Sequence, residues 1–202
     1  MIKLYYHPRS TFARRAHMVL LEKAIPFELV ELDMRNRAHK SPEYLALNPY
    51  GRVPTLVEDD FVLYESTAIL EYLEATHPEP PLLPGDARGR ALVGLHMKLC
   101  DIEIGAHTGT LLFPKRFLPK EKWDLEAMDK ARRGVDRHLA IVAQSLEGKT
   151  WLVGDSYTLA DVCYTPFAEF FGLMEVALPP AVAAWAERLL ARPSAVKTKP
   201  DV

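Results

Sequence analysis

The sequence predicts an α/β half followed by an all-helical half, and three observations support this division. Strand-like and helix-like segments alternate before residue 77, a proline-rich segment follows, and little after it resembles a strand. Segment 77–85 holds four of the sixteen prolines. Proline interrupts helices and lacks the N–H that a sheet needs, so this segment is expected to be extended. We therefore predict one domain at 1–78, a linker at 79–87 and a second domain at 88–202.

The first half shows the strand and helix signals of a small α/β sheet. β-branched, aromatic or alternating apolar residues predict strands at 2–6, 27–32, 55–58 and 61–64. Helical spacing, a proline allowed in a first turn and a serine N-cap predict helices at about 10–23, at 42–47 and from Ser66 onward. The polar turn Asp59-Asp60 joins the last two strands as a hairpin.

The second half is predicted to be a helical bundle. Apolar stripes define three helices, with Leu92, Leu95, Leu99 and Ile102 on the first, Leu125, Met128, Val135, Leu139, Val142 and Leu146 on the second, and Val182, Trp185 and Leu189 on the last. Residues 159–173 are apolar almost all round, which predicts a buried central helix. Thr158 and Asp161 open that helix as a capping box, with Asp in the place of Glu.

The composition argues against several function classes. The chain has 202 residues, 49% of them apolar and 26% charged, which is typical of a globular protein. A net charge of -2 argues against nucleic-acid binding. No apolar run approaches the ~18 residues of a membrane span, so no membrane partner is expected. The strand pattern begins at Ile2, so we expect no signal peptide and a cytoplasmic location.

Cysteine and glycine are scarce in the first half. The two cysteines are Cys100 and Cys163, and only Gly51 lies before Gly85. This pattern excludes a disulfide scaffold, a cysteine-rich zinc site, and a Gly-rich phosphate loop in the first half. The seven histidines show no metal-ligand spacing, so no metal is expected.

Three loops carry candidate binding residues, each with a plain structural alternative. Val53-Pro54 begins a strand, where a cis peptide would aim backbone groups at an extended thiol peptide; the alternative is an ordinary loop. At Glu65-Ser66, the helix N-terminus and the Ser66 hydroxyl would hold a ligand carboxylate while Glu65 pairs with an ammonium; the alternative is a simple N-cap. Ser10 would point its hydroxyl at a ligand sulfur, or would only cap the first helix.

In their order and spacing over nearly the whole chain, these stretches resemble the cytosolic glutathione transferases. The matching stretches are Ile25-Pro26-Phe27-Glu28, Asn48-Pro49, Val53-Pro54-Thr55-Leu56 and Glu65-Ser66 in the first half, and Leu159-Ala160-Asp161 and Arg192-Pro193-Ser194 in the second. The resemblance implies a thioredoxin-like N-terminal domain followed by an all-helical C-terminal bundle. It also implies glutathione as co-substrate, a small hydrophobic electrophile as second substrate, and a homodimer.

The resemblance also suggests which residue activates the thiol. Ser10 lies fifteen residues before Ile25, where theta-like and zeta-like members carry a catalytic serine, and Thr11 takes the position of the beta-class cysteine. Thr11 is therefore the runner-up, and Tyr5 and Tyr6 rank third. A free thiol has a pKa of ~8.5, so little of it is thiolate at neutral pH. A serine hydroxyl that donates a hydrogen bond to the sulfur, beside a helix N-terminus, would favour the thiolate.

The remaining site residues are also carried over from the resemblance. The implied glutathione-binding residues are His39, Lys40 and Arg52 at the glycine end, Val53 and Pro54 beside the cysteinyl backbone, Glu65 and Ser66 at the amino-acid head group, and Asp101 toward the partner subunit's glutathione. The hydrophobic electrophile would meet Phe12, Leu112, Phe113 and Phe117. The alternatives are solvated charges at His39, Lys40 and Asp101, and ordinary bundle core at 110–117.

Two departures from the family pattern bear on the reaction. Zeta-like isomerases carry a cysteine two residues after the serine, where this chain has Phe12. No dithiol lies at the first helix, so a thioredoxin or glutaredoxin mechanism is not expected. The leading prediction is a transferase that joins the glutathione thiolate to a hydrophobic electrophile. The alternatives are a glutathione-dependent disulfide reductase or peroxidase, and a non-catalytic binding or regulatory protein of the same fold.

Overall fold

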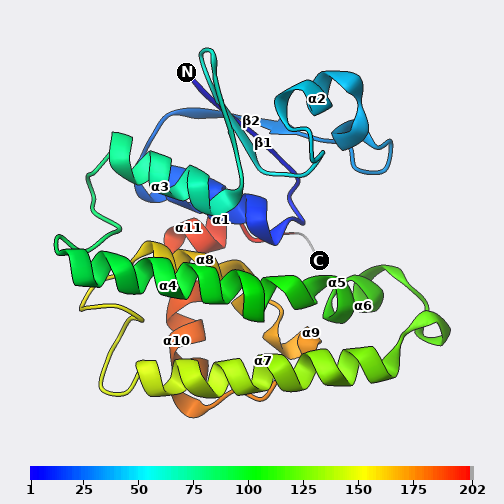
Figure 1. Ribbon diagram of the computed structural model, residues 1–202, viewed down its shortest axis with the longest axis vertical. Helices are drawn as coiled ribbons and strands as arrows, with labels where there is room; N and C mark the ends of the chain where they lie inside the picture. The colour runs from blue at the N-terminus through cyan, green and yellow to red at the C-terminus, as the bar shows by residue number, and fades with distance from the viewer. Residues whose placement is uncertain (201–202) are drawn as a thin grey trace. The chain divides into compact units, whose positions relative to one another are not determined.

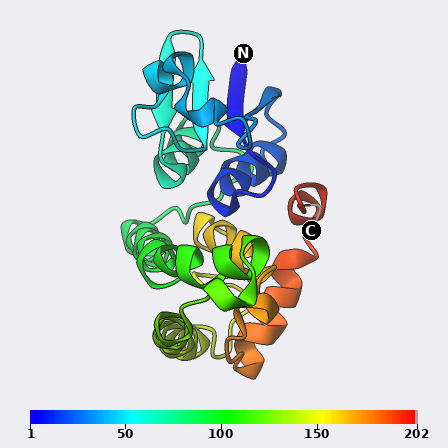
Figure 2. The same cartoon turned by 90° about the vertical axis from the view of Figure 1, so that its right-hand side faces the viewer.

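The computed structural model describes residues 1–200 and divides into two compact units (Figures 1 and 2). The first unit holds Met1–Leu82 together with the segment that starts at Arg192, and the second holds Leu83–Ala191. The break at Leu82 lies within the segment predicted as a linker. The last segment joins the first unit, whereas the sequence placed it with the second half.

The first unit is built on a four-stranded sheet in the order β2-β1-β3-β4. Its strands are β1 (Ile2–Tyr6), β2 (Phe27–Glu31), β3 (Thr55–Glu58) and β4 (Phe61–Tyr64). β1 pairs in parallel with β2 and antiparallel with β3, and β3 and β4 form the predicted hairpin. Leu4 on β1 and its partner Leu56 on β3 are fully buried, so the middle of the sheet faces the core of this unit.

Three helices accompany the sheet. They are α1 (Thr11–Glu22), α2 (Pro42–Leu47), which follows the 3₁₀ turn η1 (Ala38–Lys40), and α3 (Ser66–Thr76). α1 and α3 pack against each other, and α2 lies apart from both (Figure 1). The sequence suggested Ser66 as the N-cap of α3, but the N-cap is Glu65, with φ +71°, and Ser66 is already the first helical residue.

The C-terminal helix α11 (Pro193–Lys197) belongs to the first unit because side chains of α1 hold it there. Arg14 Nη2 donates a hydrogen bond of 2.8 Å to the carbonyl oxygen of Ala195. Arg192 donates two hydrogen bonds, of 2.8 and 2.6 Å, to the Glu22 carboxylate. Such charge-assisted, bidentate pairs are strong, which explains why a segment that follows the helical half in sequence packs with the first unit.

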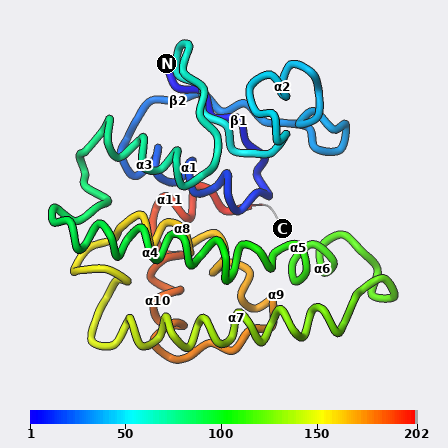
Figure 3. The backbone as a smooth tube through the Cα atoms, viewed as in Figure 1, coloured from blue at the N-terminus to red at the C-terminus, as the bar shows by residue number. Residues whose placement is uncertain are grey.

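The second unit contains α-helices joined by connections of different lengths, of which the segment 146–158 between α7 and α8 is a long one (Figure 3). They are α4 (Ala87–Glu103), α5 (Thr108–Leu111), α6 (Phe113–Phe117), α7 (Leu125–Ser145), α8 (Leu159–Ala168), α9 (Phe171–Met174) and α10 (Pro180–Leu190), with 3₁₀ turns η2 (Gly105–His107) and η3 (Lys120–Lys122). Every residue of α8 is buried, and Thr158 and Asp161 form the predicted capping box. The helix predicted over 159–173 ends at Ala168, because the Phe170 N–H bonds to the Phe167 carbonyl in a tighter turn.

The helix predicted from the stripe of Leu92, Leu95, Leu99 and Ile102 is present as α4, but this stripe is not its buried face. Leu92, Leu95 and Ile102 are 49%, 50% and 46% exposed. The buried residues are Val93, His96, Met97 and Cys100, which lie on the opposite side of the same helix. Both faces carry apolar residues at helical spacing, so periodicity alone could not tell which face packs against α8.

Candidate functional site

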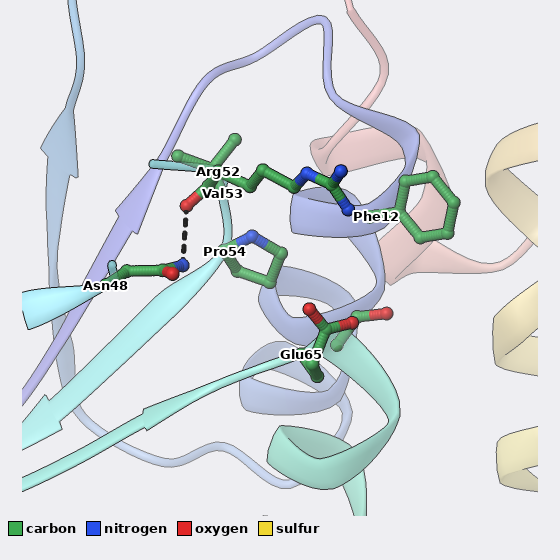
Figure 4. Close-up of a pocket in the computed structure, with 7 residues that line it drawn as sticks. Phe12, Asn48, Arg52, Val53, Pro54 and Glu65 are labelled. Carbon is green, nitrogen blue, oxygen red and sulfur yellow. Dashed lines mark hydrogen bonds between the residues drawn. The ribbon is translucent and has the colours of Figure 1, made fainter. Parts of the chain in front are cut away.

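A cavity of about 110 Å³ in the first unit joins the three loops that the sequence singled out (Figure 4). Its wall comes from the start of α1, the loop before β3, and the turn between β4 and α3. The lining residues are Phe12, Asn48, Arg52, Val53, Pro54, Glu65 and Ser66. All except Asn48 were predicted as site residues. The fold therefore places most of the proposed glutathione-binding side chains around one space.

The loop before β3 is held in shape by hydrogen bonds from two buried side chains. Asn48 Nδ2 donates to the carbonyl oxygen of Arg52 at 2.9 Å, the bond drawn in Figure 4. The Tyr44 hydroxyl donates to the same oxygen at 2.6 Å. The peptide bond between Val53 and Pro54 is cis. Asn48 and Tyr44 thus position the backbone that lines the cavity, a role that the sequence analysis missed because it depends on partners across the loop.

Gly51 lets two backbone segments approach closely beside this loop. Its φ is +56°, a conformation that glycine adopts readily. A Cβ at this position would lie 2.6 Å from the carbonyl oxygen of His39 and 2.7 Å from Lys40 Nζ. Lys40 Nζ also donates to the carbonyl oxygen of Tyr50 at 3.0 Å. His39 and Lys40 do not line the cavity, but this contact brings them to the same loop as Arg52.

His39 lies among positive charges. Partial burial lowers its pKa from the usual value, and the nearby charges of Lys40 and Arg37 lower it further. Its Nδ1 atom is buried and has no hydrogen-bond partner among residues 1–200. The positive charges of Lys40 and Arg37 at this turn are suited to an anionic group.

The turn between β4 and α3 places a carboxylate beside a helix N-terminus. The positive φ of Glu65 is unusual for a residue other than glycine, and its side chain is exposed. The Ser66 side chain is buried, and its Oγ accepts a hydrogen bond of 3.2 Å from Arg15 Nη1. The first N–H groups of α3 have no partner within the helix, and the positive end of the helix attracts anions. Glu65 and the start of α3 can therefore bind the ammonium and the carboxylate of one amino-acid head group.

The start of α1 carries the predicted thiol-activating residues. Ser10 caps the helix, since its Oγ accepts a hydrogen bond of 3.2 Å from the Ala13 N–H. This bond uses an oxygen lone pair and leaves the hydroxyl hydrogen free to donate. Thr11 is the first helical residue, and Phe12, the next, lines the cavity. Neither Ser10 nor Thr11 is among the described lining residues, so their contact with a ligand sulfur stays a prediction.

The other predicted site residues belong to the second unit. Asp101 is half-buried on α4. Leu112 is 4% exposed between α5 and α6, so it is part of the bundle core. Phe113 and Phe117 are about half exposed, and their ring centroids lie 5.2 Å apart. Of the tract 110–117, these two rings are therefore the ones that a hydrophobic molecule can reach.

Residues 1–200 hold neither a metal-binding cluster nor a membrane-spanning helix. No three His, Cys, Asp or Glu side chains there are placed so that they could hold a metal ion. In the same residues, none of the helices combines the length and the apolar character needed to cross a membrane.

Comparison with known proteins agrees with this fold and site. The family model of the glutathione S-transferase N-terminal domain matches residues 4–81, and that of the C-terminal domain matches 106–193. Glutathione S-transferase 3 of Zea mays is 33% identical over 98% of this chain and 92% of its own length. A maleylacetoacetate isomerase of Pseudomonas aeruginosa is 35% identical over 88% of this chain and 86% of its own.

A solved structure extends the likeness to three dimensions. A glutathione transferase from Burkholderia graminis, with two glutathione molecules bound per subunit, superimposes with a TM-score of 0.87 at 28% identity. The alignment covers 98% of this chain and 87% of that one. The architecture is thus a thioredoxin-like domain with a helical domain. The chain belongs to the glutathione S-transferase family.

Proposed function

We propose that this protein is a serine-type glutathione S-transferase that activates the thiolate of glutathione for attack on a hydrophobic electrophile. The cavity of the first unit carries the proposal, because Glu65, the start of α3 and the Val53-Pro54 edge surround one space. An amino-acid head group followed by an extended thiol peptide matches this arrangement. The cavity's 110 Å³ suits the head group, and the rest of glutathione extends along the loop that carries Arg52.

The two ends of glutathione are assigned to opposite sides of this loop. Glu65 pairs with the ammonium, and Ser66 with the N-terminus of α3 holds the neighbouring carboxylate. Val53 pairs with the cysteinyl backbone as in an added strand, with Pro54 beside it. The glycine carboxylate is assigned to the side of the loop that carries His39, Lys40 and Arg52, where the two cations supply donors.

Ser10 donates its hydroxyl hydrogen to the glutathione sulfur while its oxygen continues to cap α1. Lowering the thiol pKa by ~2 units corresponds to roughly 2.7 kcal/mol. A charge-assisted hydrogen bond and the helix dipole supply stabilisation of this order. The thiol proton passes to solvent, the sulfur bonds to the electrophilic carbon, and the leaving group departs with its bonding electrons. Thr11 is the alternative donor.

The family resemblance also guides the assignment of the electrophile site, the partner subunit and the location of the protein. Phe12, Leu112, Phe113 and Phe117 are assigned to the electrophile by the family resemblance, and the exposure of the Phe113 and Phe117 rings supports the assignment of those two. The exposed apolar face of α4 is assigned to the homodimer interface, since exposed apolar patches mark such surfaces. Asp101 on the same helix is assigned to the partner subunit's glutathione. A cytoplasmic enzyme fits these assignments.

Isomerisation is a second candidate reaction, because a maleylacetoacetate isomerase is among the relatives. Phe12 stands where zeta-like isomerases carry a cysteine, which favours conjugation. A substrate panel of aryl halides, peroxides, hydroxyethyl disulfide, dehydroascorbate and maleylacetoacetate separates conjugation, reduction and isomerisation.

The experiment that tests the proposal titrates the thiolate of bound glutathione by its ultraviolet absorbance in the wild type, Ser10→Ala, Ser10→Thr and Thr11→Ala. We expect Ser10→Ala to raise the pKa of bound glutathione by about 1–2 units and to cut aryl-halide turnover roughly 10- to 100-fold. Ser10→Thr keeps both the cap and the hydroxyl and should restore most of the activity. Glutathione affinity should change little in all three variants.

Two results would contradict the proposal. Unchanged turnover in Ser10→Ala would exclude Ser10 as the thiolate partner, and a loss in Thr11→Ala would then assign the role to Thr11. Failure of the wild type to bind millimolar glutathione would instead support the non-catalytic alternative.

A further inference from the structure

A second cavity, of about 180 Å³, lies within the helical unit among α5, α6, α7 and α9. Its apolar wall includes Leu111, Met128 and Met174, which are 1%, 7% and 0% exposed. The half-buried indole of Trp123 adds a flat surface. A cavity of about 150 Å³ with apolar walls is known to bind benzene, so this space is large enough for one aromatic ring with a small substituent.

A buried ammonium lines the same cavity. The Lys115 side chain is only 5% exposed, and its Nζ donates to the carbonyl oxygen of Leu173 at 2.9 Å. The same atom pairs with Glu175 Oε1 at 2.9 Å and lies 6.0 Å from the centroid of the Trp123 ring. The cavity therefore combines an apolar floor and an aromatic wall with a buried ammonium, and its charged lining also includes Asp129, Arg132 and Glu175.

The second cation at this cavity is already committed to carboxylates. Arg132 pairs with Asp129 at 2.7 Å and with Asp136 at 2.8 Å, using separate nitrogens. Asp136 also accepts a hydrogen bond of 2.7 Å from the Ala177 N–H, which holds this group in place. We therefore expect a ligand anion to replace the carboxylate partner of Lys115 and not those of Arg132.

The two side chains of the Lys115–Glu175 ion pair differ greatly in solvent exposure, and this difference permits the replacement. The Glu175 side chain is 73% exposed, whereas that of Lys115 is almost completely buried. Glu175 can move its carboxylate into water at little desolvation cost, but Lys115 cannot follow it. Another carboxylate can take the place of Glu175 at the ammonium, so that the buried Lys115 keeps a negatively charged partner.

We propose that this cavity binds a small aromatic carboxylate, with its carboxylate on Lys115 in place of Glu175 and its ring between Met128, Met174 and Trp123. Methionine sulfur atoms make favourable contacts with aromatic rings, and indole packs well against them. An aliphatic acid of the same length lacks both contacts, and a neutral aromatic molecule lacks the ion pair.

The experiment uses the full-length protein with saturating glutathione, so that the first site is occupied. Sodium benzoate is titrated by calorimetry and by tryptophan fluorescence. We expect Lys115→Met to weaken benzoate binding at least about tenfold, since it removes the charged partner. We expect Glu175→Gln to strengthen it several-fold, since the competing carboxylate is gone. Arg137→Met, an exposed cation on α7 outside the cavity, makes the same charge change as Lys115→Met and should leave binding unchanged.

Two further arms locate the ligand. Trp123→Phe should retain the heat of binding but lose the fluorescence change, although Trp151 and Trp185 remain. Benzamide, which has the same ring without the charge, should bind the wild type more weakly and should not respond to Glu175→Gln.

Several outcomes would overturn the proposal. The first is that glutathione displaces benzoate. The second is that Lys115→Met binds benzoate as tightly as the wild type, and the third is that Glu175→Gln leaves benzoate affinity unchanged. Because Glu175 is exposed, Glu175→Gln still decides the question if Lys115→Met does not fold.

Discussion

Arg15 on α1 donates a hydrogen bond from Nη1 to the Oγ of Ser66, the first residue of α3, at 3.2 Å. Arg15 is fully buried and Ser66 is 5% exposed. The Arg15 guanidinium carbon also lies 4.8 Å from the centroid of the Phe12 ring. One buried cation thus supports two residues that line the cavity of the first unit, one on each helix.

Arg15→Met should weaken the support of Phe12 and Ser66, although Arg15 itself does not line the cavity. We expect glutathione affinity to fall about tenfold, and stability to fall by about 2–4 kcal/mol, because a buried hydrogen-bonding partner is lost. Calorimetry and urea unfolding measure the two effects. In a double-mutant cycle, Arg15→Met with Ser66→Ala should lose less affinity than the sum of the single changes. Strict additivity would show that this bond does not support glutathione binding.

Asp161→Asn should destabilise the helical unit even though it preserves side-chain shape. Asp161 Oδ1 accepts hydrogen bonds from the Leu152 N–H at 3.2 Å and from Trp185 Nε1 at 2.9 Å. Oδ2 accepts from the N–H and the hydroxyl of Thr158, both at 3.0 Å. Either orientation of an amide places its NH₂ group against N–H donors. We expect a loss of about 2–4 kcal/mol in urea unfolding.

The control for Asp161→Asn is Asp155→Asn, the same chemical change at an exposed position. It should alter stability by less than about 0.5 kcal/mol. Equal losses of stability in the two variants would mean that the hydrogen bonds accepted by buried Asp161 do not stabilise the helical unit.

Glu22→Gln should weaken the attachment of the C-terminal segment to α1. Burial favours the protonated form of Glu22, but hydrogen bonds from Arg192 and Ser194 and the Arg192 charge outweigh it, so its pKa lies below the usual value. Because the folded pKa is the lower one, this stabilisation is present above the unfolded pKa and is lost as the pH falls through the folded pKa. At neutral pH we expect Glu22→Gln to cost about 1–3 kcal/mol.

The matched control for Glu22→Gln is Glu28→Gln. Glu28 pairs with Lys3 at 3.6 Å, and both side chains are about half exposed. Its loss should cost less than about 1 kcal/mol, because exposed pairs are weak. Limited proteolysis should also cleave the C-terminal segment faster in Glu22→Gln only. Similar stability and cleavage in both variants would contradict the attachment role.

His17 should make the protein less stable in mild acid. Burial and then the charge of Arg14 lower its pKa to about 4, and its ring lies between Tyr6 and Phe27. The unfolded chain binds a proton near pH 6.5, whereas the folded protein does not, so stability is lost as the pH falls from about 6.5 toward about 4. Between about pH 7.5 and about pH 5, this residue accounts for a loss of up to about 2 kcal/mol.

The measurement is urea unfolding across this pH range in the wild type and in His17→Phe, which keeps an aromatic ring. The variant should show a shallower dependence, and the remaining slope reports the other buried histidines, His96 and His138, whose pKa values burial also lowers. Parallel curves would rule out His17 as the source of the acid sensitivity.

The strands, the hairpin and the two-part division could be predicted because their signals are local. Alternating residues at 2–6 and 27–32, the Asp59-Asp60 turn and the prolines at 77–85 act within a few residues of themselves. The binding loops could be predicted for the same reason, since Val53-Pro54 and Glu65-Ser66 have distinctive backbone chemistry.

The buried partners could not be predicted from local pattern. Asn48 and Tyr44 meet at the Arg52 carbonyl, and Arg15 meets Ser66 across 51 residues of sequence. A polar residue has the same sequence signal whether it lies in solvent or bonds across a core. For this reason the residues proposed to bind glutathione were easier to predict than the buried residues that position them.

The sequence by itself determined the order of elements and the chemistry of the loops that meet at the cavity, because propensity, turns and caps depend on near neighbours. Only the tertiary structure decided which face of α4 is buried and where the C-terminal segment packs. Helix α4 has two apolar faces. The face with Val93 and Met97 is buried in the unit where α4 packs with α8, and the face with Leu92 and Leu95 is exposed. The last segment joins the first unit because Arg192 meets Glu22 across 170 residues, a pairing that no local pattern specifies.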